Sequence, residues 1–418
     1  MKERRSCFKG SSFVFTTHRM KPRLHYYNPG HETATLQRTP RYTPSANVRR
    51  MLDELAILPA WYAEKGDYVY TETDVPPGFL SLLPEAIRPE VTIVSREAFQ
   101  ASPFPEMLAA PWGLSPQSAG FYQELMSRYG LAIELPVWKE AYAALMGRQT
   151  GAACFKRIAG LLPSHAFPSV PLFFSGWPAI EAWLCQHPGA SVIKTPYSSS
   201  GRGLLWLREG ALKEKDRNWI RGALNKQGCV SVEPALEAIR DFALEFFINE
   251  QGEVSYEGIS VFDTSPQGAY RGNRLMRQEA LEHLITLAAG KALFRQVKEA
   301  TAVAIGEVYA GYAGYIGVDM LVYRAADGTS ALHPCIEVNM RYTMGMAAIR
   351  LFDTYIHPDA EGVFNLTYGA DPETVVSAHR KQEEAYPLTF KEGKLRSGYL
   401  SLCPVTPQTH YIAYILIQ

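Results

Sequence analysis

The stretch that decides the fold is CIEVNMR, residues 335–341, taken together with YIGVDMLVY, residues 315–323. Both segments are apolar and have the length of a strand. Residues two apart on a strand point to the same face, so Glu337 and Asn339 present three oxygens to one side. With Asp319 they predict a Mg²⁺ site, because Mg²⁺ prefers carboxylates, phosphates and water. The alternative is a solvated strand face, but the apolar neighbours suggest buried acids, which need a partner.

The turn between the two strands tests this prediction. A two-residue turn would place Asp319 on the face opposite to Glu337. A three-residue loop over residues 326–328, with its glycine left-handed, pairs Asp319 with Cys335 and Gly317 with Glu337. The two acids then share a face as diagonal neighbours, roughly 7 to 8 Å apart. We therefore predict the odd-length loop, or a bulge that keeps the same parity.

A second informative stretch is VIKTPYSSSGRG, residues 192–203. Lys194 ends an apolar strand and precedes a loop of small hydroxyl and glycine residues, which offers a point charge and closely approaching backbone N–H groups. This environment suits phosphate oxygens. The loop is not a Walker A motif, which needs its lysine after the glycines. A flexible hairpin loop without function is the alternative, and it is the commoner reason for such a sequence.

Composition excludes several classes of protein. The 418 residues correspond to two to four domains, and 47% apolar with 20% charged residues is ordinary globular usage. Lys plus Arg and Asp plus Glu are both 42, so no overall charge attracts nucleic acid or anionic lipid. The six cysteines form no C-x-x-C pair, which argues against zinc or disulfides and favours a reducing cytoplasm. No apolar stretch reaches the roughly 18 residues of a membrane helix.

Strand and helix patterns divide the chain into successive parts. Strands alternate with helices at the start, which predicts a parallel sheet, and a long helix is expected from about residue 279 to 309. The basic extension before Met20 is either a transit peptide or lies upstream of a start at Met20, and we favour the second. The expected parts are a basic, disordered extension (1–19), an α/β domain (20–130), an α+β lobe with linker helices (131–235), a second lobe with the metal site (236–365) and a C-terminal β-containing segment (366–418).

The ordered set of motifs resembles the ATP-grasp superfamily over about residues 130–350. The set runs from the lysine strand and its Ser/Gly loop through V-E-P, R-D-F-A-L-E and G-V-D to E-V-N-M-R. Each piece is common, whereas the order is not. The resemblance implies a mixed α/β and α+β protein whose two α+β lobes clamp ATP, preceded by the N-terminal α/β domain.

The resemblance also implies roles for individual residues. Lys194 would contact the α- and β-phosphates, and Glu233 would lie at the adenine. Asp241, with Glu237 as the alternative, would bind the ribose hydroxyls. The loop residues that would close over the β- and γ-phosphates are Ser198, Ser199, Ser200, Gly201 and Gly203. The ligands of Mg²⁺, or of Mn²⁺ in its place, would be Asp319, Glu337 and Asn339.

One position departs from the pattern of several ligases in the superfamily, which carry arginine where this chain has Gly317. Transition-state charge would then be stabilised by Arg341, Arg271 or Arg274. The segment YRGNR, residues 270–274, is either an anion-binding loop or an exposed polar turn.

Two histidines are harder to assign. His31 and Glu32 either line a cleft for a second substrate or simply begin a helix. We expect His333 to be structural.

The implied activity is an ATP- and Mg²⁺-dependent ligase that joins a carboxylate to an amine through an acyl phosphate. The alternatives are a small-molecule kinase and a nucleotide-binding regulatory protein without catalysis. The expected partners are small-molecule acids and amines, with neither nucleic acid nor membrane, and a homodimer is compatible with the resemblance.

Overall fold

The structure is a computed structural model, and it describes residues 21–37, 39, 43–72, 75–76, 78–101, 103–198, 203–208 and 212–418. The basic extension expected over residues 1–19 lies outside this part of the chain. So do three residues of the expected phosphate loop: Ser199, Ser200 and Gly201. Within the described residues, every helix is too short or too polar to cross a membrane.

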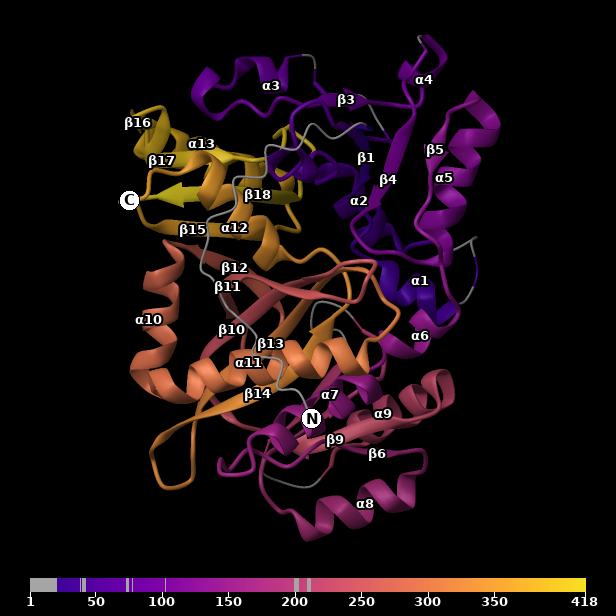
Figure 1. The fold of residues 1–418 in the computed structure, drawn as a ribbon, viewed down its shortest axis with the longest axis vertical. Coiled ribbons are helices and arrows are strands. Elements are labelled where there is room, and N and C mark those ends of the chain that lie inside the picture. The colour runs from indigo at the N-terminus through magenta and orange to yellow at the C-terminus, as the bar shows by residue number, and fades with distance from the viewer. Residues whose placement is uncertain are drawn as a thin grey trace, which may run out of the picture.

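The N-terminal part forms the parallel sheet that the alternating pattern predicts. Its five strands lie in the order β3-β2-β1-β4-β5, and Figure 1 shows it at the upper right, with α5 along its side. The strands are β1 (Arg23–Tyr26), β2 (Tyr68–Tyr70), β3 (Thr92–Val94), β4 (Met107–Pro111) and β5 (Ile133–Glu134). The α-helices are α1 (His31–Gln37), α2 (Ala46–Glu54), α3 (Phe79–Leu82), α4 (Ala98–Ala101) and α5 (Pro116–Tyr129), with short 3₁₀ turns η1 (Leu58–Trp61) and η2 (Glu85–Ile87).

A four-stranded antiparallel sheet forms the first lobe, at the bottom of Figure 1. Its strands lie in the order β6-β9-β7-β8, and their apolar side chains pack on two helices. The elements are β6 (Leu172–Phe174), α8 (Trp177–Gln186), β7 (Ser191–Lys194), β8 (Leu204–Leu207), α9 (Glu214–Gln227) and β9 (Val230–Pro234). The helices expected to link it to the N-terminal domain, α6 (Ala141–Leu145) and α7 (Arg148–Leu161), share the hydrophobic core of the second lobe instead.

A nine-stranded antiparallel sheet crosses the centre of the molecule in the order β14-β13-β10-β11-β12-β15-β18-β17-β16. The second lobe supplies β10 (Glu237–Ile248), β11 (Val254–Thr264), β12 (Tyr270–Leu275), β13 (Gly314–Arg324) and β14 (Ser330–Asn339). The C-terminal part supplies β15 (Gly362–Tyr368), β16 (Thr389–Lys391), β17 (Lys394–Ser401) and β18 (Tyr411–Ile417). Helices α12 (Met344–Tyr355) and α13 (Pro372–Ala385) accompany these strands.

The single long helix expected over residues 279–309 is wrong. The structure has two helices, α10 (Gln278–Ala289) and α11 (Lys291–Val308), separated at Gly290. The backbone of Gly290 has a φ of 83° and a ψ of 138°, a non-helical conformation that glycine adopts without steric cost. Helical periodicity continues on both sides of the break, so the pattern of apolar residues alone did not reveal it.

The hairpin between β13 and β14 has the predicted parity but a different pairing at the site. Residues 326–328 form the three-residue loop, with Gly328 at a φ of 83°. Near this loop the pairing is the predicted one, with Leu321 opposite His333. Beyond it the register shifts by two residues, so Asp319 lies opposite Glu337 and not Cys335. The shift occurs at Pro334, which lacks the N–H that a regular ladder requires.

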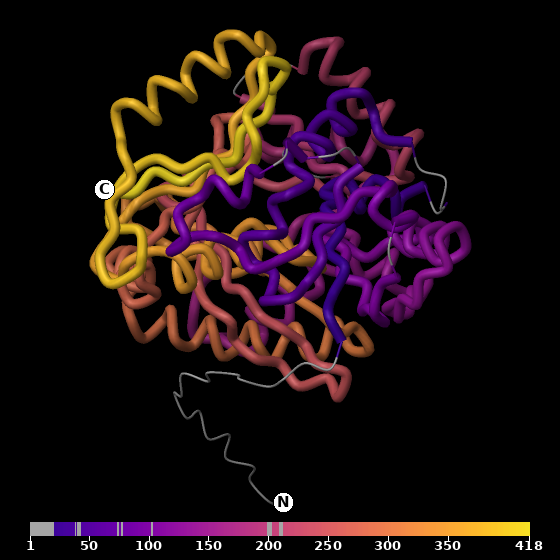
Figure 2. The backbone as a smooth tube through the Cα atoms, turned by 90° about the horizontal axis from the view of Figure 1, so that it is seen from above, coloured from indigo at the N-terminus to yellow at the C-terminus, as the bar shows by residue number. Residues whose placement is uncertain are grey.

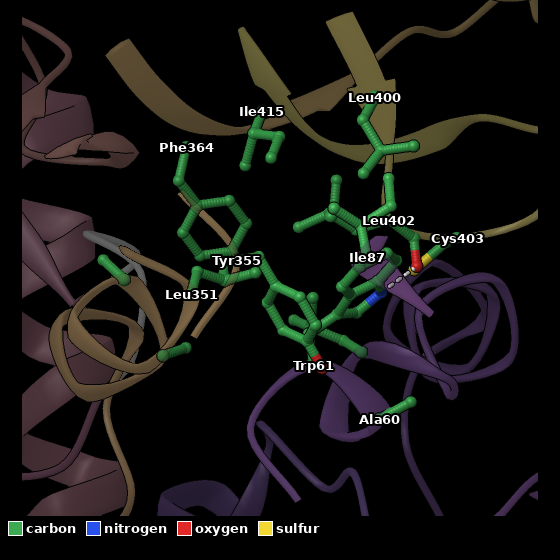
Figure 3. Close-up of a cluster of buried hydrophobic side chains, with 14 of the residues drawn as sticks. Ala60, Trp61, Ile87, Leu351, Tyr355, Phe364, Leu400, Leu402, Cys403 and Ile415 are labelled. Atoms are coloured by element: carbon green, nitrogen blue, oxygen red, sulfur yellow. Dashed lines mark hydrogen bonds between the residues drawn. The ribbon is translucent and has the colours of Figure 1, made fainter. Parts of the chain in front are cut away.

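The C-terminal segment and the N-terminal domain share one hydrophobic core, although about 300 residues separate them in the chain (Figure 3). Buried side chains from η1 and η2 meet those of α12, β15, β17 and β18. The indole of Trp61 donates a 2.6 Å hydrogen bond to the backbone oxygen of Leu402 at this contact. Figure 2 shows the C-terminal strands curving against the N-terminal chain.

The expected domain limits can be placed on these elements. The limit expected at residue 130 falls before β5, which pairs with β4 of the first sheet. The limit expected at residue 365 falls inside β15, which belongs to the central sheet. Both limits stay predictions.

Candidate active site

Alternation along the central strands separates an apolar face from a polar face. Phe242 and Leu244 of β10 and Val318 of β13 are buried on the face that α10 and α11 cover. The residues that alternate with them along the strands, including Glu245 and Asp319, point to the other face. This polar face is where the predicted metal ligands lie.

Asp319, Glu337 and Asn339 come together as predicted. Asp319 and Glu337 are direct cross-strand partners, and the Asn339 amide donates a 3.0 Å hydrogen bond to Asp319 Oδ2. Burial raises the pKa of Asp319 well above its ordinary value, and the nearby Glu337 charge raises it further. A cation at this position would favour the charged form of Asp319.

The chemistry of these side chains fits Mg²⁺. They offer two carboxylates and one amide, and all of their ligand atoms are oxygens, as Mg²⁺ requires. No cluster of three His, Cys, Asp or Glu side chains suited to a metal occurs among the described residues. The site therefore suits an ion that takes its remaining ligands from phosphate and water, and it does not resemble an all-protein metal cage.

Lys194 lies at the end of β7, as predicted, and it is 7% exposed. Its ammonium group is ion-paired with the carboxylate of Glu233 on β9. The backbone N–H of Thr195 donates a 2.9 Å hydrogen bond to the Gly203 oxygen, which closes the base of the loop. A Cβ atom on Gly203 would lie 2.3 Å from the Cβ of Ser198, so this close approach requires glycine.

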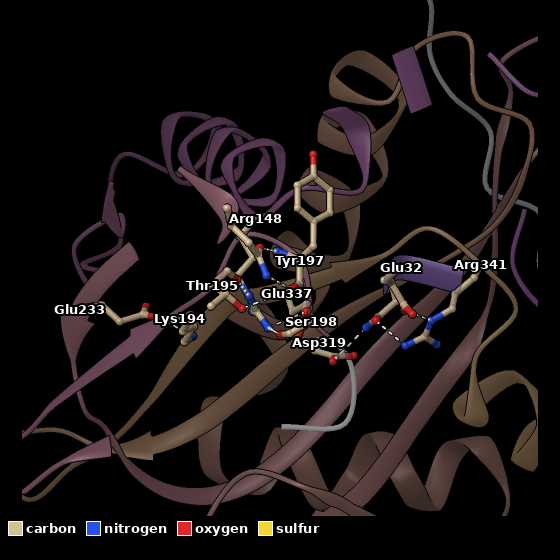
Figure 4. Close-up of polar contacts among 12 residues, drawn as sticks. Glu32, Arg148, Lys194, Thr195, Tyr197, Ser198, Glu233, Asp319, Glu337 and Arg341 are labelled. Atoms are coloured by element: carbon tan, nitrogen blue, oxygen red, sulfur yellow. Dashed lines mark hydrogen bonds and ion pairs between the residues drawn. The ribbon is translucent and has the colours of Figure 1, made fainter. Parts of the chain in front are cut away.

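Arg148 joins this loop to the predicted metal ligands, and the sequence analysis did not identify it. Its guanidinium pairs with Glu337 Oε1 at 2.9 Å, donates to the Thr195 backbone oxygen at 3.0 Å and to Ser198 Oγ at 3.2 Å (Figure 4). Arg148 is the first residue of α7 and follows Gly147. A glycine followed by a basic residue at a helix start was the available signal, because anions bind at helix N-termini.

Arg341 connects the predicted metal ligands to the N-terminal domain. Its Nη2 donates a 2.8 Å hydrogen bond to Asn339 Oδ1, and its Nε donates one of 2.8 Å to Glu32 Oε1. Burial alone would raise the pKa of Glu32. The interactions with His31 and Arg341 lower this pKa by more than burial raises it, so the pKa of Glu32 is below its ordinary value. His31 and Glu32 begin α1, and Glu32 also faces the site through Arg341.

Close packing explains why residue 317 is glycine, where several ligases of the superfamily have arginine. A Cβ atom on Gly317 would lie 2.7 Å from Glu245 Oε2 and 2.9 Å from the Thr343 methyl group. Glu245 is 1% exposed and accepts hydrogen bonds from Thr343 at 2.9 Å and Ser260 at 3.1 Å. Burial raises its pKa to about 7. An arginine at residue 317 would need this space.

The remaining predicted residues lie on neighbouring strands. Asp241 accepts a 2.9 Å hydrogen bond from Thr264, whereas Glu237 pairs with Arg324 at 3.1 Å on the surface. Glu233, expected at the adenine, has its carboxylate on Lys194. Their roles stay predictions.

Arg271 and Arg274 lie on β12, three strands from β13. At the usual spacing of about 4.8 Å this places the two backbones roughly 14 Å apart. Arg274 pairs with Asp263 at 3.4 Å, and the structure does not bring either arginine to the acids. Arg341 is therefore the predicted charge-stabilising arginine that contacts the metal ligands directly.

The space between the two lobes is small in this conformation. A cavity of about 30 Å³ is lined by Arg148, Lys194, Glu233 and Glu337 among others. Pockets for drug-sized ligands have volumes of roughly 300 to 1,000 Å³, so this cavity as it stands is too small for a nucleotide. The lobes touch elsewhere as well, because the Trp206 indole of β8 donates a 3.2 Å hydrogen bond to the Gln267 oxygen in the β11–β12 turn.

Comparison with known proteins gives structural matches only. The sequence matches no protein-family model and no curated protein sequence. A biotin carboxylase from Campylobacter jejuni is similar at a TM-score of 0.50 and 12% identity, over 87% of this chain and 85% of that chain. N5-carboxyaminoimidazole synthetase from Staphylococcus aureus has a TM-score of 0.47 and 9% identity, over 95% and 93% of the two chains. The corresponding ribonucleotide synthetase from Thermus thermophilus has a TM-score of 0.46 and 14% identity, over 94% and 93%.

The similarity to the biotin carboxylase concerns the fold and extends over most of both chains. A parallel α/β sheet precedes an antiparallel four-stranded lobe and a larger antiparallel sheet that carries the paired acids. The mixed α/β and α+β class predicted from the sequence is confirmed. This chain has the ATP-grasp fold.

Proposed function

We propose that the chain is an ATP- and Mg²⁺-dependent ligase that joins a carboxylate to an amine. One observation carries this proposal: Arg148 pairs with Glu337 and contacts the loop that follows Lys194. Lys194 of the first lobe, Arg148 at the start of α7 and the oxygen-bearing side chains of the second lobe thus meet between the two lobes. A metal-bound triphosphate has the complementary charges for both.

The reaction would begin with a carboxylate oxygen of the acid attacking the γ-phosphorus of ATP. The bond from that phosphorus to the bridging oxygen breaks, giving an acyl phosphate and ADP. The amine then attacks the acyl carbon, loses a proton and displaces inorganic phosphate, leaving an amide. The protein needs no side-chain nucleophile, because positioning and charge neutralisation supply the catalysis.

The residues of the chain would share these tasks. Lys194 and Arg148 would neutralise phosphate oxygens, and Arg341 would hold the γ-phosphate or the substrate carboxylate. Asp319, Glu337 and Asn339 would hold Mg²⁺, which supplies positive charge between phosphate oxygens when it is bound. Glu32 would hold Arg341 in place through its 2.8 Å contact.

Nucleotide entry would have to replace contacts that the protein now makes with itself. Arg148 would exchange Glu337 for phosphate, and Glu337 would exchange Arg148 for the metal ion. The cavity of about 30 Å³ implies that the first lobe moves away from the second as the nucleotide enters. Closure over the bound nucleotide would then exclude water from the acyl phosphate.

Product assays test the proposal. The full chain is incubated with Mg·ATP and pools of small carboxylic acids and amines, and ADP and phosphate are measured. The ligase reaction predicts phosphate release only when acid and amine are both present. ADP with a phosphorylated acid as the stable product would indicate a kinase, and nucleotide binding without turnover in every pool would indicate a regulatory protein; either result would contradict the ligase.

A further inference from the structure

A much larger cleft lies between the N-terminal domain and the second lobe. Its volume is about 1,040 Å³, and its walls come from β1 and β4 on one side and from the start of β13 and α12 on the other. Small-molecule sites have volumes of roughly 300 to 1,000 Å³, so the cleft can hold a substrate. Arg341 lines it and also reaches Asn339, which places the cleft next to the metal ligands.

Aromatic rings form one wall of the cleft. Tyr62 of the N-terminal domain stacks on Tyr342 of the second lobe, with ring centroids 4.2 Å apart and an interplanar angle of 23°. The rings of Trp112 and Tyr315 lie 5.5 Å and 4.9 Å from Tyr342. All four side chains line the cleft. A planar ring is the ligand group that packs best on such a surface, because aromatic rings gain from stacked or edge-to-face contact.

The charges in the cleft point to an anion beside these rings. Most charged side chains there are already engaged: Arg23 lies 3.6 Å from Glu64, Lys65 pairs with Glu90, and Arg88 donates to backbone oxygens. Arg350 is 44% exposed, its carboxylate partner Glu257 lies 3.8 Å away, and it lies beside two of the aromatic rings.

Arg350 also lies beside the hydroxyl groups of Tyr315 and Tyr342. The Tyr342 hydroxyl is buried and makes no well-formed hydrogen bond. A guanidinium beside phenol hydroxyls can hold a carboxylate or a phosphate through several hydrogen bonds.

We propose that this cleft binds the second substrate and that this substrate carries a planar ring and an oxyanion. The ring lies against Tyr62 and Tyr342, the oxyanion binds Arg350, and the reactive group extends towards Arg341. The role as a substrate rests on the proposed ligase function, whereas the binding itself does not. Titrations without nucleotide therefore test the cleft separately from the reaction.

Isothermal titration of the full chain with four small probes tests this assignment. Phenylacetate and phenyl phosphate carry both features, phenylacetamide lacks the charge, and cyclohexylacetate lacks the aromatic ring. We expect at least one of the two aromatic anions to bind about tenfold more tightly than phenylacetamide and cyclohexylacetate. A hydrogen bond to a charged group and an aromatic ring contact each change a dissociation constant by about this factor. Which of the two binds distinguishes a carboxylate from a phosphate.

Two variants locate the binding. Arg350→Gln should abolish the preference for the anion over phenylacetamide, and Tyr342→Leu should abolish the preference for the aromatic ring. Arg295→Gln, an exposed position on α11 outside the cleft, is the matched control and should bind as the unaltered chain does. Absence of binding by both aromatic anions, or unchanged preferences in Arg350→Gln and Tyr342→Leu, would overturn the proposal. Failure of the ligase assay alone would leave the cleft assignment standing.

Discussion

At the scale of single residues, the candidate metal ligands are held by neighbouring side chains. Glu337 pairs with Arg148, Asn339 bonds to Arg341, and Asp319 accepts from Asn339. These contacts satisfy buried polar atoms that would otherwise cost free energy. Binding of Mg·ATP would exchange such internal pairs for metal and phosphate contacts, so the substitutions that remove an oxygen ligand should affect activity more than folding.

Glu337→Gln should reduce ATP turnover by about 100-fold or more, because an amide is a weaker metal ligand and carries no charge. The free energy of unfolding should change little, since the side chain is 30% exposed and lies at the edge of the cavity. ADP release and chemical denaturation measure the two effects. Glu299→Gln, at an exposed position of α11, is the control. Normal turnover in Glu337→Gln would contradict the assigned metal site.

The buried side chain of His333 should make the free energy of unfolding decrease as the pH falls. Burial lowers its pKa to about 3, and Phe155 lies 4.6 Å from its ring. In the unfolded chain its pKa is near 6.5, so the unfolded state binds more protons as pH falls. Stability is therefore fully present above about pH 6.5 and is lost at lower pH, by about 2 kcal/mol between pH 7 and pH 5.

The variant His333→Asn isolates this contribution. Asparagine keeps an acceptor for the backbone N–H of Cys335 but does not titrate. Urea denaturation at pH 7 and pH 5 should show a smaller loss in the variant, whatever its absolute stability. Equal losses in both proteins would mean that His333 does not contribute.

At the scale of elements, packing against glycine determines where β10, β13 and α12 meet. Gly317→Ala should destabilise the protein by about 1 to 3 kcal/mol, because the added methyl group overlaps the Glu245 carboxylate and Thr343. Gly222→Ala on exposed α9 is the matched control, since no atom lies within 4 Å of its Cβ position, and it should stabilise by about 0.5 to 1 kcal/mol. Chemical denaturation of both variants measures the difference. Equal effects would contradict the tight contact at Gly317.

The contact between β8 and the β11–β12 turn should report movement of the first lobe. Trp206 is 39% exposed and bonds to Gln267, and Leu204 packs where a Cβ on Gly268 would lie. If nucleotide entry separates the lobes, Mg·ATP should change tryptophan fluorescence in the unaltered chain. The change should be absent in Trp206→Phe. If Mg·ATP changes the fluorescence of Trp206→Phe as much as that of the unaltered chain, this contact does not open.

The strands that carry the site could be predicted because alternation and spacing are local properties. The parity of the β13–β14 loop and the shared face of Asp319 and Glu337 followed from this reasoning and are confirmed. The two-residue shift at Pro334 could not be placed, because a bulge depends on the partner strand. The contacts of Arg148 with Glu337 and of Glu32 with Arg341 could not be predicted either, since they join elements more than 180 residues apart in the chain.

At the scale of the whole molecule, the sites lie where separate parts meet. The proposed nucleotide site lies between the first lobe and the central sheet, and the aromatic cleft lies between the central sheet and the N-terminal domain. Arg341 touches both. The N-terminal domain and the C-terminal strands share one core at one of these boundaries (Figure 3), whereas the first lobe has a small core of its own.

The place of the C-terminal strands in the central sheet could not be predicted from the sequence. The C-terminal strands read as a separate segment because their partner, β12, lies almost 90 residues earlier in the chain. Their common core with η1 involves contacts across more than 300 residues, such as that of Trp61 with Leu402. Local patterns show that a strand is present but not which distant strand lies beside it.

The central claim is that Lys194, Arg148 and the three oxygen-bearing side chains of the central sheet bind one metal–triphosphate group. A crystal structure with Mn²⁺ and a non-hydrolysable ATP analogue tests it most directly, because Mn²⁺ gives an anomalous signal. We predict at least one Mn²⁺ peak within about 2.2 Å of oxygens of Asp319, Glu337 or Asn339, with the triphosphate between them and Lys194. Mn²⁺ and triphosphate bound elsewhere, or a nucleotide whose phosphates point away from β14, would contradict the account.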